Sequence, residues 1–164
     1  MKFPKSKKYI KKVEKSNVYD VAIKTPLSST SYLTKASKNN VFLKREDLQP
    51  VFSFKLRGAY NKIFLLKKES SIERVVTASA GNHAQGVAYS ARQLKLKATI
   101  VMPVTTPSIK VSAVKRLGSQ VVLMGDTYDE AYEYAIKLSK KPKCAFVHPF
   151  DDPDVIAGQG TIGK

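Results

Sequence analysis

The chain has 164 residues, of which 43% are hydrophobic, and it carries a formal net charge of +16 at neutral pH. This length and composition suit one soluble globular domain and exclude a disordered protein, and the longest apolar runs are too short to cross a bilayer. The N-terminus lacks the apolar stretch of a secretory signal and has no arginine before Arg45, which argues against a transit peptide. A single cysteine, Cys144, excludes an internal disulfide and fits a reducing cytosol.

The positive charge comes mostly from lysines that are spread along the chain, with seven of them in residues 1–15. Arginine, which favours bidentate contacts with phosphate, is scarce. We therefore interpret the charge as lysines on solvated faces, and we expect neither a nucleic-acid nor a membrane surface. DNA binding with a steep salt dependence would contradict this interpretation.

The first part of the chain has few regular patterns. Residues 1–24 are predicted to form a basic helix followed by a loop, and residues 41–45 are predicted to form a strand. Residues 54–67 are predicted to form a helix, because apolar side chains recur there at helical spacing.

From residue 74 onward, short apolar strands alternate with amphipathic helices. The predicted strands cover residues 74–77, 98–102, 120–124 and 145–147. The predicted helices cover residues 82–95, 108–117 and 127–138, with Ser108 and either Asp126 or Thr127 as N-caps. This alternation is typical of an α/β fold with three layers, in which a parallel sheet is covered on both faces and its strands end at one common edge.

The last eight residues, 157–164, include three glycines and are predicted to form a turn that opens a further helix. A helix interrupted in its first turn buries no apolar face. We therefore expect the chain to be the front portion of a longer protein.

Lys55 is the first candidate for chemistry. It stands near the start of the predicted helix 54–67, next to Val51, Phe52 and Phe54. Apolar surroundings disfavour the ammonium form, and the partial positive charge of a helix N-terminus acts in the same direction. A neutral amine in this position can form a Schiff base. The alternative is an ordinary solvated lysine, which is the common case in a chain so rich in them.

The second candidate is the segment 77–86, which reads TASAGNHAQG and joins a predicted strand to a predicted helix. Small residues let the backbone approach a ligand, and the first N–H groups of the helix would point into the gap and form an anion site. Ser79 and Asn82 add polar side chains there. The alternative is an ordinary strand-to-helix turn with Asn82 as its N-cap.

The other side chains of metal-binding type form no ligand set. No second histidine, cysteine or carboxylate lies at ligand spacing from His83, so we interpret it as a structural histidine and expect no metal site. His148 and Cys144 are interpreted as packing or loop residues. The acidic pair 151–152 before Pro153 is interpreted as turn and helix-cap chemistry.

Several motifs occur together and in order: KRED at 44–47, SFKLRGA at 53–59, TASAGNHAQG at 77–86, and PFD at 149–151 with VIAGQGT at 155–161. With these motifs the chain resembles the serine/threonine dehydratases of the fold-type II pyridoxal-phosphate enzymes, and among them most closely the biosynthetic threonine dehydratases. The resemblance implies an incomplete fold of the tryptophan synthase beta type and pyridoxal 5′-phosphate as cofactor. It also implies conversion of L-threonine to 2-oxobutanoate and ammonia, in isoleucine biosynthesis.

The resemblance further implies roles for individual residues. Lys55 would hold the cofactor as a Schiff base and, once released by substrate, would remove the Cα proton. Phe54 would pack beside the cofactor, and Asn82 would hydrogen-bond the phenolic oxygen of its ring. The implied substrate-binding residues are Ser79, Ala80, Gly81 and His83. Related racemases carry a serine as second base where this chain has Ala80, a departure that argues against racemisation.

The resemblance divides the chain into three parts. Residues 1–45 would belong to a larger subdomain that is mostly absent, residues 46–150 would form the small α/β subdomain, and residues 151–164 would begin the return to the larger one. In the family, the glycine-rich loop that grips the cofactor phosphate lies further along the chain, as does the regulatory region. We therefore expect the 164-residue chain alone to bind cofactor weakly and to turn over little threonine; robust ammonia release from it would contradict this.

The implied protein is cytoplasmic, acts on a small amino acid, and is a homo-oligomer, a tetramer when complete. The nearest alternative is a catabolic dehydratase acting on serine and threonine, which lacks the regulatory tail. Alternatives from other classes are a non-catalytic remnant and a basic module that binds nucleic acid.

Overall fold

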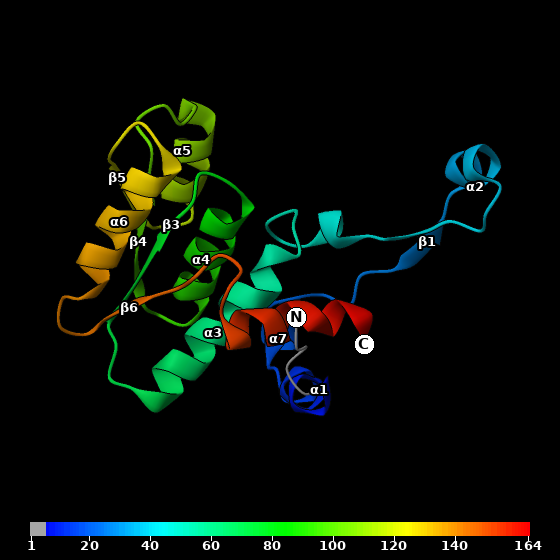
Figure 1. The fold of residues 1–164 in the computed structure, drawn as a ribbon, viewed down its shortest axis with the longest axis horizontal. Helices are drawn as coiled ribbons and strands as arrows, with labels where there is room; N and C mark the ends of the chain where they lie inside the picture. Colours follow the sequence, from blue (N-terminus) through cyan, green and yellow to red (C-terminus); the bar gives the residue numbers. More distant parts are fainter. Residues whose placement is uncertain (1–5) are drawn as a thin grey trace.

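The computed structural model describes residues 6–164 (Figure 1). The first described elements are α1 (Ser6–Glu14) and η1 (Val18–Asp20), which agree with the helix predicted within residues 1–24. Residues 1–5, which also belong to that prediction, lie outside the described residues. Over the described part of the chain, every helix is too short or too polar to cross a membrane.

Four parallel strands form the central sheet, in the order β5-β4-β3-β6. β3 (Arg74–Ala78) pairs on one side with β4 (Lys97–Met102) and on the other with β6 (Cys144–Phe146). β5 (Gln120–Leu123) pairs with the outer side of β4. All four strands were predicted within one residue at each end, because strands covered on both faces are continuous apolar runs.

Helices cover both faces of this sheet (Figure 1). The core on one face is built from α3 (Lys55–Glu69), α4 (Asn82–Gln93) and α5 (Ser108–Arg116). The other face is covered by α6 (Tyr128–Ser139). The predicted three-layer α/β fold is therefore confirmed.

The helix caps agree with the sequence in one case and differ in another. Thr127 caps α6, with Glu130 closing the box: the Glu130 N–H donates to the Thr127 hydroxyl at 3.3 Å, and the Thr127 N–H donates to the Glu130 carboxylate at 3.1 Å. Ser108 was expected to cap α5, but it is the first helical residue and Pro107 precedes it as the cap. The Pro107 carbonyl accepts the N–H of Lys110 at 2.9 Å, so the first turn closes one residue earlier than predicted.

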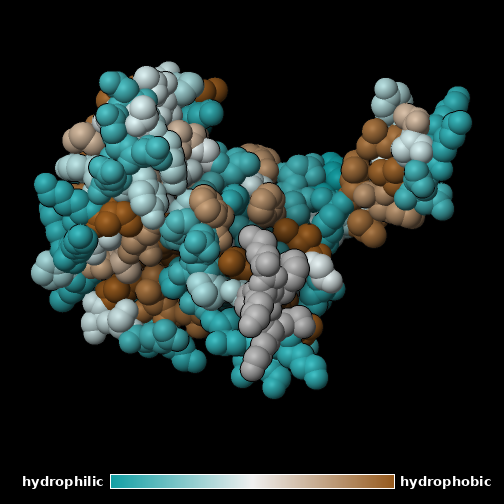
Figure 2. Space-filling view, viewed as in Figure 1, coloured by the Kyte–Doolittle hydropathy of each residue, from teal (hydrophilic) through white to brown (hydrophobic). Residues whose placement is uncertain are grey.

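An arm projects from the body (Figure 1). It consists of β1 (Leu27–Ser29), α2 (Ser31–Ser37) and β2 (Phe42–Lys44), with the two strands antiparallel. The strand at 41–45 was predicted, whereas β1 and α2 were not. Hydrophobic residues gather on the arm (Figure 2), and Leu27 and Tyr32 are 64% and 79% exposed.

The prediction for the C-terminal segment is wrong. Residues 157–160 do not form a turn that opens a helix; they are the second half of α7 (Pro153–Gly160), which η3 (Thr161–Gly163) follows. The Asp152 side chain caps α7 by accepting two backbone N–H groups at 2.8 and 3.1 Å, and Pro153 occupies the first turn. This confirms the cap role predicted for the acidic pair 151–152.

Gly158 serves the close packing of α7 against α3. A Cβ on Gly158 would lie 2.5 Å from the Arg57 carbonyl oxygen and 2.8 Å from the Gly58 Cα.

We expect Gly158→Ala to lower the free energy of unfolding by roughly 1–3 kcal/mol, because the two backbones must move apart even though alanine is the better helix former. Gly163→Ala is the matched control, since its Cβ would meet nothing within 4 Å. Urea unfolding of both variants measures the difference, and equal effects would contradict the packing argument.

Candidate active site

Lys55 is the first residue of α3, one residue after the predicted start of this helix at Phe54. Its Nζ donates a hydrogen bond to the Pro149 carbonyl at 2.9 Å, and its backbone N–H donates to the Ser53 hydroxyl at 3.2 Å. Burial lowers the pKa of the Lys55 amine below its ordinary value, and no neighbouring charge contributes to that shift. The amine is therefore closer to its neutral, nucleophilic form than a solvated lysine is.

The apolar residues beside Lys55 are buried to different degrees. Val51 is 3% exposed, whereas Phe52 and Phe54 are 78% and 40% exposed. The Lys55 Nζ lies 5.6 Å from the centroid of the Phe54 ring. An exposed aromatic ring next to an amine is available to pack against a flat ligand.

The loop between β3 and α4 carries the second predicted feature. Gly81 is in the N-cap position of α4, and no side chain caps this helix. The Gly81 N–H donates to the Ser79 hydroxyl at 3.2 Å, and a Cβ on Gly81 would meet nothing within 4 Å. Within residues 6–164, no side chain caps the first N–H groups of α4, an arrangement that suits an anion. Asn82 is the exposed first residue of the helix, so the alternative reading of Asn82 as N-cap is wrong.

The packing of α4 brings this loop beside Lys55. A Cβ on Gly86, in the second turn of α4, would lie 3.1 Å from the carbonyl carbon and oxygen of Lys55. Only glycine permits this approach without moving the helices apart. The loop 79–81 with the start of α4 follows β3, and Pro149 follows β6, so both lie at the carboxyl edge of the parallel sheet, where open α/β folds bind their ligands.

The His83 side chain is turned into the protein. It is 3% exposed, and its Nε2 lies 3.2 Å from the Val147 carbonyl oxygen. Burial lowers the pKa of His83 to about 4, so the ring is neutral at physiological pH. A substrate contact from His83 would therefore come from its backbone N–H and not from its ring. Among the described residues, no group of three His, Cys, Asp or Glu side chains is arranged to hold a metal ion.

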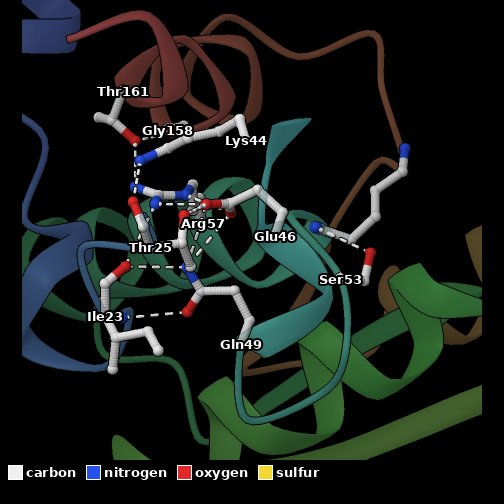
Figure 3. A network of polar contacts seen from close by, with 10 residues as sticks. Ile23, Thr25, Lys44, Glu46, Gln49, Ser53, Arg57, Gly158 and Thr161 are labelled. Carbon is white, nitrogen blue, oxygen red and sulfur yellow. Dashed lines mark hydrogen bonds and ion pairs between the residues drawn. The ribbon is translucent and has the colours of Figure 1, made fainter. Parts of the chain in front are cut away.

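A buried ion pair lies two residues beyond Lys55 (Figure 3). The Arg57 side chain is fully buried, and its Nε and Nη2 donate to the Glu46 carboxylate at 2.7 and 2.8 Å. The same guanidinium donates to the Thr161 hydroxyl at 3.1 Å and to the Ile23 carbonyl at 3.3 Å. Arg57 thus ties the start of α3 to η3 and to the N-terminal segment.

Further hydrogen bonds satisfy Glu46 and extend this network. The Thr25 hydroxyl and the Gln49 amide both donate to the Glu46 carboxylate. Gln49 also exchanges two hydrogen bonds with the backbone of Ile23, at 2.9 and 3.0 Å. This network was not predicted from the sequence. The available signal was that Glu46 and Arg57 lie in two of the recognised motifs, but only the tertiary fold reveals that they pair.

The comparisons with known proteins agree with this geometry. The family model described as "Pyridoxal-phosphate dependent enzyme" matches residues 18–164. The threonine dehydratase of Nicotiana attenuata is 58% identical over 94% of this chain, and the biosynthetic L-threonine dehydratase of Burkholderia multivorans is 54% identical over 94%. The structure of processed threonine deaminase isoform 2 from Solanum lycopersicum superposes with a TM-score of 0.90 at 51% identity, covering 98% of this chain and 45% of that one.

The match covers only part of each relative. This chain spans 26% of the Nicotiana protein and 31% of the Burkholderia protein. The family model nevertheless extends over nearly the whole chain and includes every residue of the candidate site. The chain therefore belongs to the family of pyridoxal-phosphate-dependent enzymes and is homologous to part of the biosynthetic threonine dehydratases.

Proposed function

We propose that this chain provides the amine and the substrate loop of a pyridoxal-phosphate-dependent L-threonine ammonia-lyase, which forms 2-oxobutanoate and ammonia in isoleucine biosynthesis. The observation that carries the proposal is the partly buried Lys55 amine, with its lowered pKa, beside the uncapped N-terminus of α4. A solvated lysine would have neither this burial nor the lowered pKa.

The side chains around Lys55 fit the proposed cofactor. The amine can bond the cofactor aldehyde, the exposed Phe54 ring can pack beside a flat pyridine, and the exposed Asn82 amide can donate to a phenolic oxygen. When bound, pyridoxal 5′-phosphate would supply an electron sink for the Cα carbanion. Beyond binding the cofactor, the Lys55 amine would take the proton from the substrate Cα.

The loop after β3 fits an amino-acid carboxylate. Ser79, Ala80 and Gly81 are half-buried, and the backbone N–H groups there and at His83 lie at the positive end of α4. Binding a carboxylate at this point would orient the substrate Cα toward the amine. The methyl side chain of Ala80 cannot transfer a proton, which favours elimination over racemisation at this site.

The substrate assay tests the proposal on the protein expressed from its own gene and supplied with cofactor. We expect release of 2-oxobutanoate from L-threonine to exceed release of pyruvate from L-serine, and we expect no D-amino acid. Faster turnover of serine would favour the catabolic alternative. Absence of both products, with salt-dependent binding of DNA, would instead favour the non-enzymatic alternatives.

The proposal also covers compartment and assembly. We propose a cytoplasmic homo-oligomer, a tetramer when complete, and the lone Cys144 supports a reducing compartment. Among the relatives, a Solanum lycopersicum protein is named chloroplastic and a Schizosaccharomyces pombe protein mitochondrial, so the compartment varies within the group. Fractionation followed by light scattering of the purified protein tests both parts.

A further inference from the structure

The segment 147–149, which follows β6, makes two kinds of contact through its backbone carbonyls. The Val147 carbonyl accepts two hydrogen bonds, and the Pro149 carbonyl accepts one from Lys55. Val147 is fully buried, and its carbonyl accepts the Thr77 hydroxyl at 2.8 Å and the His83 Nε2 at 3.2 Å. Two residues later, the Pro149 carbonyl accepts the Lys55 Nζ at 2.9 Å. The acceptor for the amine is therefore two residues away from a carbonyl that β3 and α4 fix in place.

The hydrogen bond from His83 fixes the state of its ring. A carbonyl can only accept, so Nε2 carries the hydrogen and Nδ1 carries a bare lone pair. Nδ1 is buried and has no hydrogen-bond partner within residues 6–164. Burial lowers the pKa of His83 to about 4 against the opposing effect of the Val147 carbonyl, and Lys55 on α3 and His148 after β6 lower it further. The neutral ring is thus a constant donor from mildly acidic pH upward.

We propose that His83 is a positioning residue for the Lys55 amine. By holding the Val147 carbonyl, its ring fixes the segment 147–149, and the Pro149 carbonyl in turn sets the position and the hydration of Nζ. This inference rests on the proposed function of Lys55. It concerns the His83 ring and is separate from any substrate contact by the His83 backbone.

The proposal predicts that loss of the His83 donor hydrates Lys55. In a His83→Leu protein the segment 147–149 loosens and water replaces the Pro149 carbonyl as acceptor. Replacing the carbonyl by water as the acceptor has little direct effect on the pKa of Lys55. The added water, however, removes the burial that lowers this pKa. The pH midpoint of Lys55 labelling should therefore move upward, and the neutral fraction of the amine below that midpoint should fall roughly threefold to tenfold.

Labelling tests this in the protein expressed from its own gene after removal of cofactor. Acetic anhydride is added at a series of pH values, and the Lys55 peptide is quantified by mass spectrometry. His83→Gln should restore most of the wild-type midpoint, because its amide can donate to the same carbonyl. Ser90→Ala is the matched control: Ser90 is also fully buried on α4, and its hydroxyl has no partner in the described part of the chain. It should leave the Lys55 midpoint unchanged.

A folded His83→Leu protein with a wild-type Lys55 midpoint would overturn the proposal. If that variant does not fold, Thr77→Val tests the step that the proposal requires, since it removes the other donor to the Val147 carbonyl with little change of shape. An unchanged Lys55 midpoint in Thr77→Val would show that anchoring of this carbonyl does not position Nζ, which also overturns the proposal. Borohydride trapping of bound cofactor is run in parallel. Trapping on another lysine would reject the proposed function, whereas the labelling midpoint would still decide whether His83 positions Lys55.

Discussion

In the protein expressed from its own gene and supplied with cofactor, Lys55→Ala is expected to abolish the yellow absorbance of bound cofactor and to slow ammonia release from L-threonine by roughly 10³-fold or more. Two contributions are lost together: the covalent attachment of the cofactor and the base that takes the Cα proton. Alanine keeps the first turn of α3 intact, because it is a good helix former and, among the described residues, the Lys55 side chain hydrogen-bonds only the Pro149 carbonyl. Absorbance spectra and a 2-oxobutanoate assay measure the two effects separately.

The control for this variant comes from the same helix. Lys67→Ala removes an exposed lysine whose Nζ donates to the Leu94 carbonyl at 2.8 Å, far along α3 from the site. It should keep both the absorbance and the activity. Borohydride reduction of the wild-type protein should fix the cofactor on the peptide that contains Lys55. An unchanged spectrum in Lys55→Ala would remove Lys55 from the proposed mechanism.

The features predicted correctly from the sequence are those that local patterns encode. The central strands β3 and β4 are buried along most of their length, β5 and β6 extend the same sheet with partly buried residues, and all four appear as short apolar runs. The helices α3, α4 and α6 show helical spacing of apolar residues. The start of α3 near Lys55 likewise follows from the local pattern. The direction of the pKa shift of its amine was also predicted, but the burial that causes it depends on the tertiary fold, since the neighbouring Phe52 is 78% exposed. Fold and principal residue could therefore be argued before any tertiary contact was known.

The features that were missed depend on contacts between distant residues. Glycines in the segment 157–160 suggested a turn, but both lie inside α7, where Gly158 meets the backbone of α3 and Gly160 meets the Val13 side chain of α1. The arm includes β1 and α2, which were not predicted. Among the described residues, α2 has no buried side chain, so its sequence shows little of the hydrophobic periodicity that predicts a helix. Glu46 and Arg57 are eleven residues apart in the sequence, and Arg57 and Thr161 are more than a hundred apart. A pattern of neighbouring residues therefore cannot reveal this network.

Arg57→Met is expected to lower the free energy of unfolding by about 3–5 kcal/mol. Methionine fills much of the same space, but it leaves the Glu46 carboxylate buried with only the Thr25 and Gln49 donors. An unpaired buried charge costs far more than the pair contributes, since the desolvation penalty is no longer offset. Urea unfolding at neutral pH measures the loss.

The pH dependence separates a stranded charge from lost packing. In the wild-type protein burial raises the pKa of Glu46, but the Arg57 guanidinium, with Thr25 and Gln49, outweighs it and holds this pKa below the ordinary value of 4.5. The stability that Glu46 contributes is thus fully present above its unfolded pKa and is lost as the pH falls through the folded one. In Arg57→Met burial dominates, so the pKa of Glu46 rises and folding takes up a proton. The deficit against wild type should therefore be largest at neutral pH and shrink as the pH falls toward 4.5.

Two further variants isolate the buried carboxylate as the cause. Arg45→Met is the matched control: Arg45 bonds Asp47 with similar geometry, at 2.8 and 2.9 Å, but the two side chains are 38% and 58% exposed, so solvent already screens them and the variant should lose far less stability. Adding Glu46→Gln to Arg57→Met removes the stranded charge and should recover part of the loss, with little remaining dependence on pH. If Glu46→Gln instead destabilised the Arg57→Met protein further, the loss would lie in the packing of residue 57 and not in an uncompensated carboxylate beneath the Lys55 helix.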